Sequence, residues 1–294
     1  MTTKGNVLLS VLFLISYTLF SQYLDFESGQ NISGYPGDEI NTMWSPDGNR
    51  IAFESIVNGK SSIYIYDINN DTIFHFTNKN ANFRNPVWHP EENKLVIDSD
   101  INGNDYLYFM DVSTFVISPM FQRNVICKDP SYSTSDRQIY FTGYNEIEKK
   151  WEVYSYDFIY DNLNEVSDLR FNCTLPEISP NGKLIIYSID DPFSNRSDIS
   201  IMNWYGEQTV NLKTIKTNDY IWHPAGLKFL FIGKDEYARP QLFSVWKDGT
   251  HIEQITNTTL DIASPAVSPD GSKLALSVKT ESGYDIIILN FEDY

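Results

Sequence analysis

Short apolar runs separated by polar turns recur along the chain from residue 22 onward. Branched and aromatic residues gather in stretches such as Ile51-Ala52-Phe53 and Leu95-Val96-Ile97. Turn-forming triplets such as Pro46-Asp47-Gly48 and Lys247-Asp248-Gly249 stand between these runs. Because Asp-Gly and Asn-Gly pairs supply the positive φ angles that tight hairpins need, the pattern predicts short antiparallel strands joined by hairpins.

One turn motif recurs at a nearly constant spacing. Its anchors are Pro46, Pro90, Thr134, Pro180, Pro224 and Pro269. Successive anchors stand 44, 44, 46, 44 and 45 residues apart, and each unit carries four apolar runs. Four short strands at a period of about 45 residues are typical of one propeller blade. The sequence therefore predicts an all-β fold, a six-bladed β-propeller of four-stranded antiparallel blades over residues 22–294.

The sixth unit ends after its third strand, with no room for an outer one. The outer strands of other units hold Thr77 and Thr256, each 13 residues before an anchor. The residue 13 positions before Pro46 is Ser33, at the end of Gln30-Asn31-Ile32-Ser33. We therefore expect an N-terminal strand to complete the last blade and close the ring, which would remove unpaired strand edges.

Residues 1–21 differ from the rest of the chain. Lys4 is the only charged residue before Asp25, Val7–Phe20 is almost wholly apolar, and Ser21 is a small residue suited to cleavage. This order is typical of a secretory signal peptide, and the run is short for a membrane span. The sequence predicts a signal peptide over 1–21 and a periplasmic or secreted mature protein. An uncleaved membrane anchor is the alternative.

The charge balance limits the class of partner. The chain has 22 Lys and Arg against 39 Asp and Glu, a net charge of −17. Nucleic-acid backbones bind clusters of Lys and Arg, and no basic run is present, so nucleic acid is excluded as a partner. Anionic membranes are disfavoured for the same reason, and any membrane contact is expected to be peripheral. We expect a monomer without a cofactor.

The candidate binding residues occupy one repeat position, five residues before each anchor. This position holds Asn41, Asn85, Asp129, Leu175, Asp219 and Ser264. We expect it to ring the mouth of the central channel, where Arg84 and Lys128, one residue earlier, would add a local positive pair. The predicted ligand-binding set is therefore Asn41, Arg84, Asn85, Lys128, Asp129 and Asp219. The alternative is that Asn and Asp stand there for turn formation.

Histidines and acidic residues do not form a convincing metal or catalytic constellation. His89 and His223 share one repeat position in blades two and five, so they would lie about 20 Å apart and could not both bind one zinc ion. A local role in the turn is expected for them. The acidic stretch Asp190–Asp198 is expected to be a solvated loop, with an ion site as the alternative, because its spacing does not match a calcium loop. No Gly-x-Ser-x-Gly elbow is present.

Two sets of residues have a structural and a functional interpretation. Trp44, Trp88, Tyr132 and Trp222 share a repeat position and are expected to wedge between blades, with a sugar-stacking platform as the alternative. Cys127 and Cys173 occupy one repeat position in adjacent blades. Inner strands about 10 Å apart exceed the Cα separation of a disulfide, so buried thiols are expected, although convergence near the axis would permit a bridge.

The repeated order apolar-Ser-Pro-Asp-Gly-x-Lys/Arg-apolar-Ala-apolar, as in Val267–Leu276, resembles the WD40-like repeat of TolB-type β-propellers. We expect no α/β domain of the kind that precedes the propeller in TolB and no hydrolase domain. Because no catalytic constellation is found either, we expect a non-enzymatic propeller that binds a cell-envelope protein or peptide segment through its channel mouth, as TolB-like propellers can. TolB-like blades also occur in oligogalacturonate lyases, so a carbohydrate-active or sugar-binding propeller is the alternative function.

Overall fold

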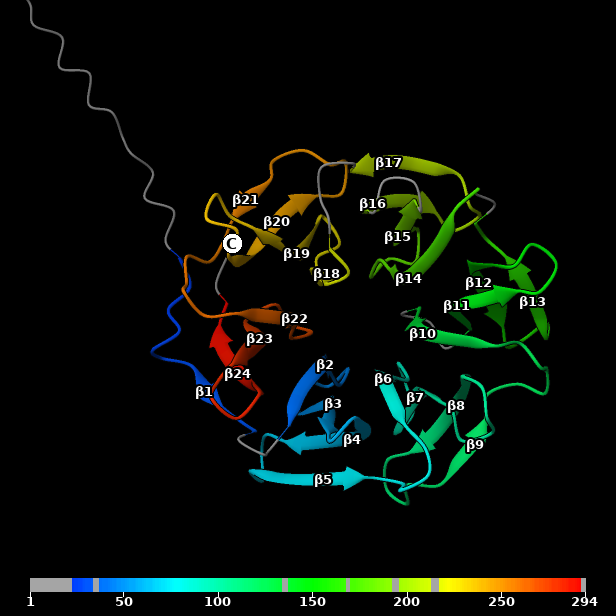
Figure 1. The fold of residues 1–294 in the computed structure, drawn as a ribbon, viewed down its shortest axis with the longest axis horizontal. Helices are drawn as coiled ribbons and strands as arrows, with labels where there is room; N and C mark the ends of the chain where they lie inside the picture. Colours follow the sequence, from blue (N-terminus) through cyan, green and yellow to red (C-terminus); the bar gives the residue numbers. More distant parts are fainter. Residues whose placement is uncertain are drawn as a thin grey trace, which may run out of the picture.

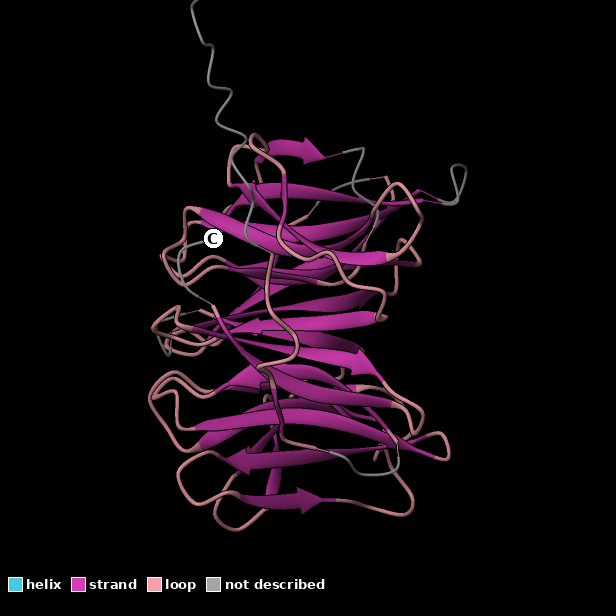
Figure 2. Ribbon diagram, turned by 90° about the vertical axis from the view of Figure 1, so that its left-hand side faces the viewer, coloured by secondary structure: helices cyan, strands magenta, loops and turns pink. Residues whose placement is uncertain are grey.

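The computed structural model describes residues 23–33, 37–133, 137–167, 170–191, 196–212 and 217–291. The predicted signal peptide, residues 1–21, lies outside these ranges. Within them every regular element is a β-strand (Figure 2). No helix long and apolar enough to span a bilayer occurs in this part of the chain.

Six antiparallel sheets of four strands surround a central axis (Figure 1), which confirms the predicted six-bladed propeller. Blade one comprises β2 (Asp38–Trp44), β3 (Arg50–Val57), β4 (Lys60–Asp67) and β5 (Thr72–Phe76). Blade two comprises β6 (Phe83–Trp88), β7 (Lys94–Ser99), β8 (Tyr106–Asp111) and β9 (Ile117–Pro119). Blade three comprises β10 (Cys127–Tyr132), β11 (Gln138–Asn145), β12 (Lys150–Asp157) and β13 (Asn162–Glu165). Blade four comprises β14 (Asn172–Ile178), β15 (Leu184–Asp191), β16 (Arg196–Asn203) and β17 (Gln208–Leu212). Blade five comprises β18 (Tyr220–Trp222), β19 (Lys228–Lys234), β20 (Pro240–Trp246) and β21 (Glu253–Gln254). Blade six comprises β22 (Ile262–Val267), β23 (Lys273–Lys279), β24 (Tyr284–Asn290) and the N-terminal strand β1 (Gln30–Asn31).

The repeated turn is held by its own side chains. Ser45 Oγ donates to Asp47 Oδ1 at 2.5 Å and accepts from the Arg50 amide at 2.9 Å, while Gly48 adopts a φ of 70°. This φ lies in the left-handed region that glycine enters without steric cost. In the His-containing copies, His89 Nδ1 accepts from the Glu92 amide at 2.9 Å, which confirms the local role predicted for it.

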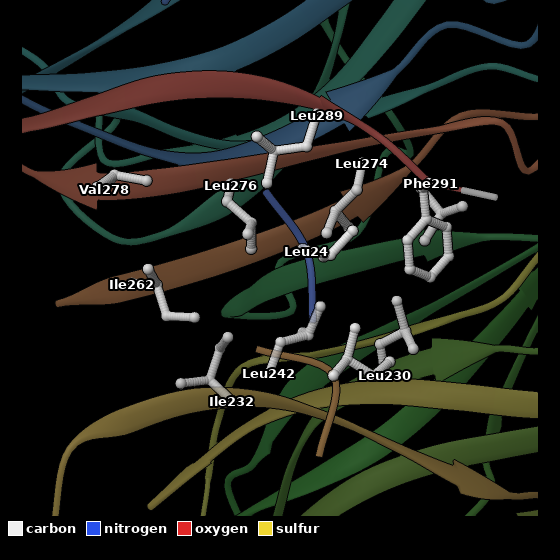
Figure 3. Close-up of a cluster of buried hydrophobic side chains, with 12 residues drawn as sticks. Leu24, Leu230, Ile232, Leu242, Ile262, Leu274, Leu276, Val278, Leu289 and Phe291 are labelled. Carbon is white, nitrogen blue, oxygen red and sulfur yellow. The ribbon is translucent and has the colours of Figure 1, made fainter. Parts of the chain in front are cut away.

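The ring closes through the N-terminal segment, as predicted. Gln30 and Asn31 of β1 pair with Ile288 and Ile287 of β24. Leu24, further upstream, is buried in the apolar cluster between blades five and six, with Leu242 on one side and Leu274 on the other (Figure 3). The segment therefore joins the last blade by backbone pairing and by apolar packing.

The outer strand of blade five is shorter than the apolar pattern predicts. The run His251–Thr256 suggested a strand, but β21 comprises only Glu253 and Gln254. His251 has a φ of 54°, which is incompatible with an extended strand, because it completes the turn after Gly249. His251 is therefore a turn residue, whereas His75 lies on the outer strand β5.

The aromatic repeat residues wedge between blades. Trp44 Nε1 donates to the Ala266 carbonyl at 3.1 Å, Trp88 to that of Met43 at 3.1 Å, and Trp222 to that of Glu177 at 3.0 Å. Each indole thus bonds to the inner strand of the preceding blade. The structural interpretation of these residues is confirmed.

Cys127 and Cys173 are free and buried. Burial raises the pKa of each thiol to about 12, so both act as small apolar groups in the core. The structure therefore favours the buried thiols over the bridge.

Candidate functional site

All six inner strands, which surround the centre of the view in Figure 1, line a pocket at one end of the central channel. Each blade contributes the residue five positions before its anchor: Asn41, Asn85, Asp129, Leu175, Asp219 and Ser264. We call this space the mouth pocket. Four of the six predicted ligand-binding residues therefore come together here, while Arg84 and Lys128 are not among the residues that line it.

The backbone at the mouth pocket has an unusual conformation. Left-handed φ angles occur at Asn41 (52°), Asn85 (50°), Asp129 (52°), Leu175 (54°) and Ser264 (48°). Each of these residues sits at a register shift inside its inner strand, so the special backbone is a bulge rather than a turn between strands. Asn and Asp tolerate this conformation well. Since Leu175 and Ser264 adopt it too, the backbone alone does not require an amide or a carboxyl group.

A chain of hydrogen bonds crosses from blade one to blade three. Asn41 Nδ2 donates to Glu54 Oε2 at 2.9 Å and to Asn85 Oδ1 at 2.8 Å. Asn85 Nδ2 donates to Asp98 Oδ1 at 2.7 Å and to Asp129 Oδ1 at 3.2 Å. The two asparagine side chains therefore link three carboxyl groups around the mouth.

Glu54 and Asp98 are members of this network that the repeat analysis did not identify. They stand on β3 and β7 and are 2% and 1% exposed. Burial raises the pKa of both side chains. An acidic residue inside an otherwise apolar strand was the available signal for them.

One oxygen of Asp129 in the mouth pocket accepts no hydrogen bond. The side chain is 10% exposed, and its Oδ2 atom has no hydrogen-bond partner among the described residues. Lys128 Nζ lies 3.8 Å from this same oxygen. Burial raises the pKa of Asp129 to about 6, so the group is mainly ionised above that pH. Burial likewise raises the pKa of Asp219.

The predicted positive pair is occupied by internal contacts. Arg84 Nε lies 3.1 Å from Asp98 Oδ2, and its guanidinium also contacts Asp105. Lys128 Nζ lies 5.1 Å from the ring centre of Trp151. Arg84 therefore balances carboxylates beside the mouth pocket, whereas Lys128 partly offsets the charge of Asp129 within it.

The opposite end of the channel is apolar. It is lined by aromatic and proline side chains: Trp44, Trp88, Tyr132, Trp222, Pro46, Pro90, Pro180, Pro224 and Pro269. Glu177 lines both this space and the mouth pocket. Ser131 Oγ donates to Glu177 Oε2 at 3.1 Å, and burial raises the pKa of the carboxyl group to about 7.

Replacing Glu177 by Gln is expected to flatten the dependence of stability on pH. The native pKa of about 7 lies above the ordinary glutamate value of 4.5, so the folded state keeps a proton that the unfolded state releases. The stability contributed by this proton is therefore lost as pH rises from about 4.5 through 7, by about 3 kcal/mol. Urea unfolding at pH 5 and pH 8 measures the difference. Glu236→Gln, in an exposed turn, is the control, and an equal pH dependence in wild type and Glu177→Gln would contradict the expectation.

Within the described ranges, no group of three or more His, Cys, Asp or Glu side chains is placed to hold a metal ion. Of the stretch Asp190–Asp198, which the sequence predicts to be a solvated loop, residues 192–195 lie outside those ranges. The described remainder is strand rather than loop: Asp190 pairs with Ser197 and Ile189 with Asp198 between β15 and β16, and Ser197 Oγ donates to Asp190 Oδ1 at 2.5 Å.

Comparison with known structures shows the fold. TolB from Acinetobacter baumannii is 18% identical, with a TM-score of 0.64 over 84% of this chain, and this chain spans 64% of that protein's length. A putative TolB from Agrobacterium tumefaciens is 15% identical, with a TM-score of 0.68 over 89% of this chain and 93% of its own. An oligogalacturonate lyase in complex with manganese is 10% identical, with a TM-score of 0.59 over 90% of this chain and 93% of its own.

No curated protein matches the sequence. The family model of the TolB beta propeller domain matches residues 16–217, which is more than half of the chain. This match is consistent with the repeated turn motif and with the six blades of the fold. The chain belongs to the TolB beta propeller domain family.

Proposed function

We propose that this protein is a non-enzymatic binding module whose mouth pocket holds a basic segment of a cell-envelope protein. The observation that carries the proposal is the Oδ2 atom of Asp129, a nine-tenths buried carboxylate oxygen that accepts no hydrogen bond from the described residues and has only the longer contact with Lys128 Nζ at 3.8 Å, in a pocket that also contains Asp219. A buried ionised acid without a full set of hydrogen bonds is unfavourable until a cation or donor reaches it. A Lys or Arg side chain of a partner supplies both.

The acidic lining favours a cationic ligand over an anionic one. Arg84 and Lys128 are held by Asp98, Asp105 and Trp151, so they do not offer a free positive pair to the pocket. The net charge of −17 adds a long-range attraction for basic partners. Asn41 and Asn85 also line the pocket; their side-chain N–H groups are bonded within the network, so a bound segment would meet their carboxamide oxygens.

The proposed place of action is the periplasm or the outside of the cell. The apolar run within residues 1–21 supports export, with 22–294 as the mature propeller. The likeness to TolB structures supports an envelope partner, and we propose that the protein acts as a monomer. The carbohydrate alternative has less support, because the indoles of Trp44, Trp88 and Trp222 are used in blade packing.

A peptide-display selection with the mature chain tests the proposal. We expect the enriched peptides to carry a Lys or Arg at a constant position. Asp129→Asn, which keeps the shape and removes the charge, should weaken their binding about 10- to 100-fold, because a buried charged hydrogen bond contributes about 1.5–3 kcal/mol. Titration calorimetry or fluorescence anisotropy gives the affinity.

Asp248→Asn is the matched control, because it makes the same charge change at an exposed turn. It should leave the affinity within about twofold of wild type, as expected of a solvent-screened charge. Enriched peptides without a basic residue, or equal affinities of wild type and Asp129→Asn, would overturn the basic-segment proposal. Failure to enrich any peptide would direct the search to glycans.

A further inference from the structure

Two buried carboxyl groups face each other where the ring closes. Glu39 of β2, in blade one, is 0% exposed, and Asp285 of β24, in blade six, is 5% exposed. The two groups lie within hydrogen-bonding reach of each other. One oxygen of each, Glu39 Oε2 and Asp285 Oδ1, has no hydrogen-bond partner in the described part of the chain. This seam therefore holds two acids with an unsatisfied oxygen on each.

The corresponding seam between blades three and four is built differently. Glu152 of β12 occupies the position of Asp285, because these residues pair with Gly143 and Val278 at matching points of their blades. Lys150 Nζ lies 2.7 Å from Glu152 Oε1. The position of Glu39 is taken there by the small apolar Cys173. That seam thus has one acid with a cation beside it.

The seam between blades six and one has no room for such a cation. Gly283 stands at the position of Lys150, and a Cβ atom there would lie 1.6 Å from the Gly37 carbonyl oxygen. The neighbouring Lys279 of β23 pairs instead with Asp38 of β2 at 3.1 Å. The remaining charged side chain beside Glu39 on β3, Glu54, is bonded to Asn41 in the channel.

The polar neighbours of the two acids leave Glu39 Oε2 and Asp285 Oδ1 without a hydrogen bond among the described residues. Ser55 Oγ donates to Glu39 Oε1 at 3.0 Å, and Asn31 Nδ2 donates to Asp285 Oδ2 at 3.3 Å. Ser33 Oγ accepts from the Ile286 amide at 2.7 Å, and its hydroxyl group also interacts with Glu39. Two open oxygens are too few for a calcium ion, which takes about six to eight oxygen ligands. A single proton between them satisfies both.

We propose that Glu39 and Asp285 form a proton-dependent clasp that joins blade one to blade six. With one proton shared, the pair makes an acid–carboxylate hydrogen bond across the seam. Without it, two buried negative charges repel each other at the point where the ring closes. Burial, reinforced by Asp285, raises the pKa of Glu39 to about 7, so the clasp is lost as pH rises through neutrality.

Hydrogen–deuterium exchange of the mature chain at pH 5.5 and pH 8.5 tests the clasp. After correction for intrinsic rates, we expect the β24 amides to lose about tenfold or more of their protection at the higher pH, as a pKa rise of more than one unit predicts. The same strand of blade three, β12, is the internal reference and should change less. Glu39→Gln supplies a permanent donor to Asp285, so β24 should stay protected at both pH values.

Glu177→Gln is the matched control, because it changes another buried acid to its amide away from this seam. Glu177→Gln should still lose more protection in β24 than in β12 when the pH is raised from 5.5 to 8.5. If Glu39→Gln does not fold, Asp285→Asn places the amide on the other side and makes the same prediction. Equal loss in wild type and in the folded amide variant would overturn the proposal. The proposal would also be overturned if calcium chloride restored the protection of β24 in the wild-type chain at pH 8.5 to its level at pH 5.5, because a metal ion would then occupy the seam.

Discussion

A chain that begins at Ser33 is expected to be less stable than one that begins at Gln22 by about 5 kcal/mol. The shorter chain loses the burial of Leu24 and Ile32, each of which contributes about 1.5–3 kcal/mol. It also loses the bonds from the Leu24 amide to the Ile255 carbonyl and from the Ile32 amide to the Ile286 carbonyl, at about 1 kcal/mol each. Urea unfolding followed by circular dichroism measures the difference.

The same truncation is expected to cause association. Without β1, the outer edge of β24 presents unpaired backbone groups beside Ile286–Ile288, and free apolar edges pair with other chains. Size-exclusion chromatography with light scattering detects this. The double variant Leu24→Ala, Ile32→Ala keeps the backbone of β1, so it should lose stability but remain monodisperse. An equal unfolding midpoint for the two chain lengths would show that the strand does not hold the ring.

Gly283→Ala is expected to destabilise the fold by about 3 kcal/mol or more, because the new methyl group overlaps backbone atoms that cannot rotate away. The added Cβ would lie 1.6 Å from the oxygen and 2.6 Å from the carbonyl carbon of Gly37. Blade six would have to move away from blade one to accommodate it. Thermal unfolding measures the loss.

Gly103→Ala is the matched control for this substitution. Gly103 also has a positive φ, 92°, but no heavy atom lies within 4 Å of its added Cβ. It should lose only about 1 kcal/mol, the backbone penalty of alanine at such an angle. If both variants lost the same amount, the close approach at Gly283 would not be a constraint.

The architecture was predictable because the repeated turn requires particular residue types at particular positions. Ser45, Asp47 and Gly48 each have a separate role in the turn, and enough of the motif persists in the other copies for its period to count the blades. The outer strands carry no such demand. They pair on one side only, which is why His251–Thr256 suggested a longer strand than β21.

The site was predictable only in part. A repeat position maps onto a ring, so Asn41, Asn85 and Asp129 could be placed at one end of the channel. Their partners Glu54 and Asp98 could not, because the bulge in each inner strand changes which side chains meet there and depends on φ angles that the sequence does not reveal. The sequence also could not show that Arg84 pairs with Asp98 and Asp105 rather than with a ligand, because these pairings depend on tertiary contacts.

The route of the N-terminal segment has a mechanical consequence. Any pulling force that reaches the propeller through its N-terminus enters at blade six, where Leu24 and the two residues of β1 are the first resistance. Such a load would peel the closing strand before it reached blades two to five. A protein tethered from this end would therefore yield first at the seam of its ring, and the force at which it yields would depend on the pairing of β1 with β24.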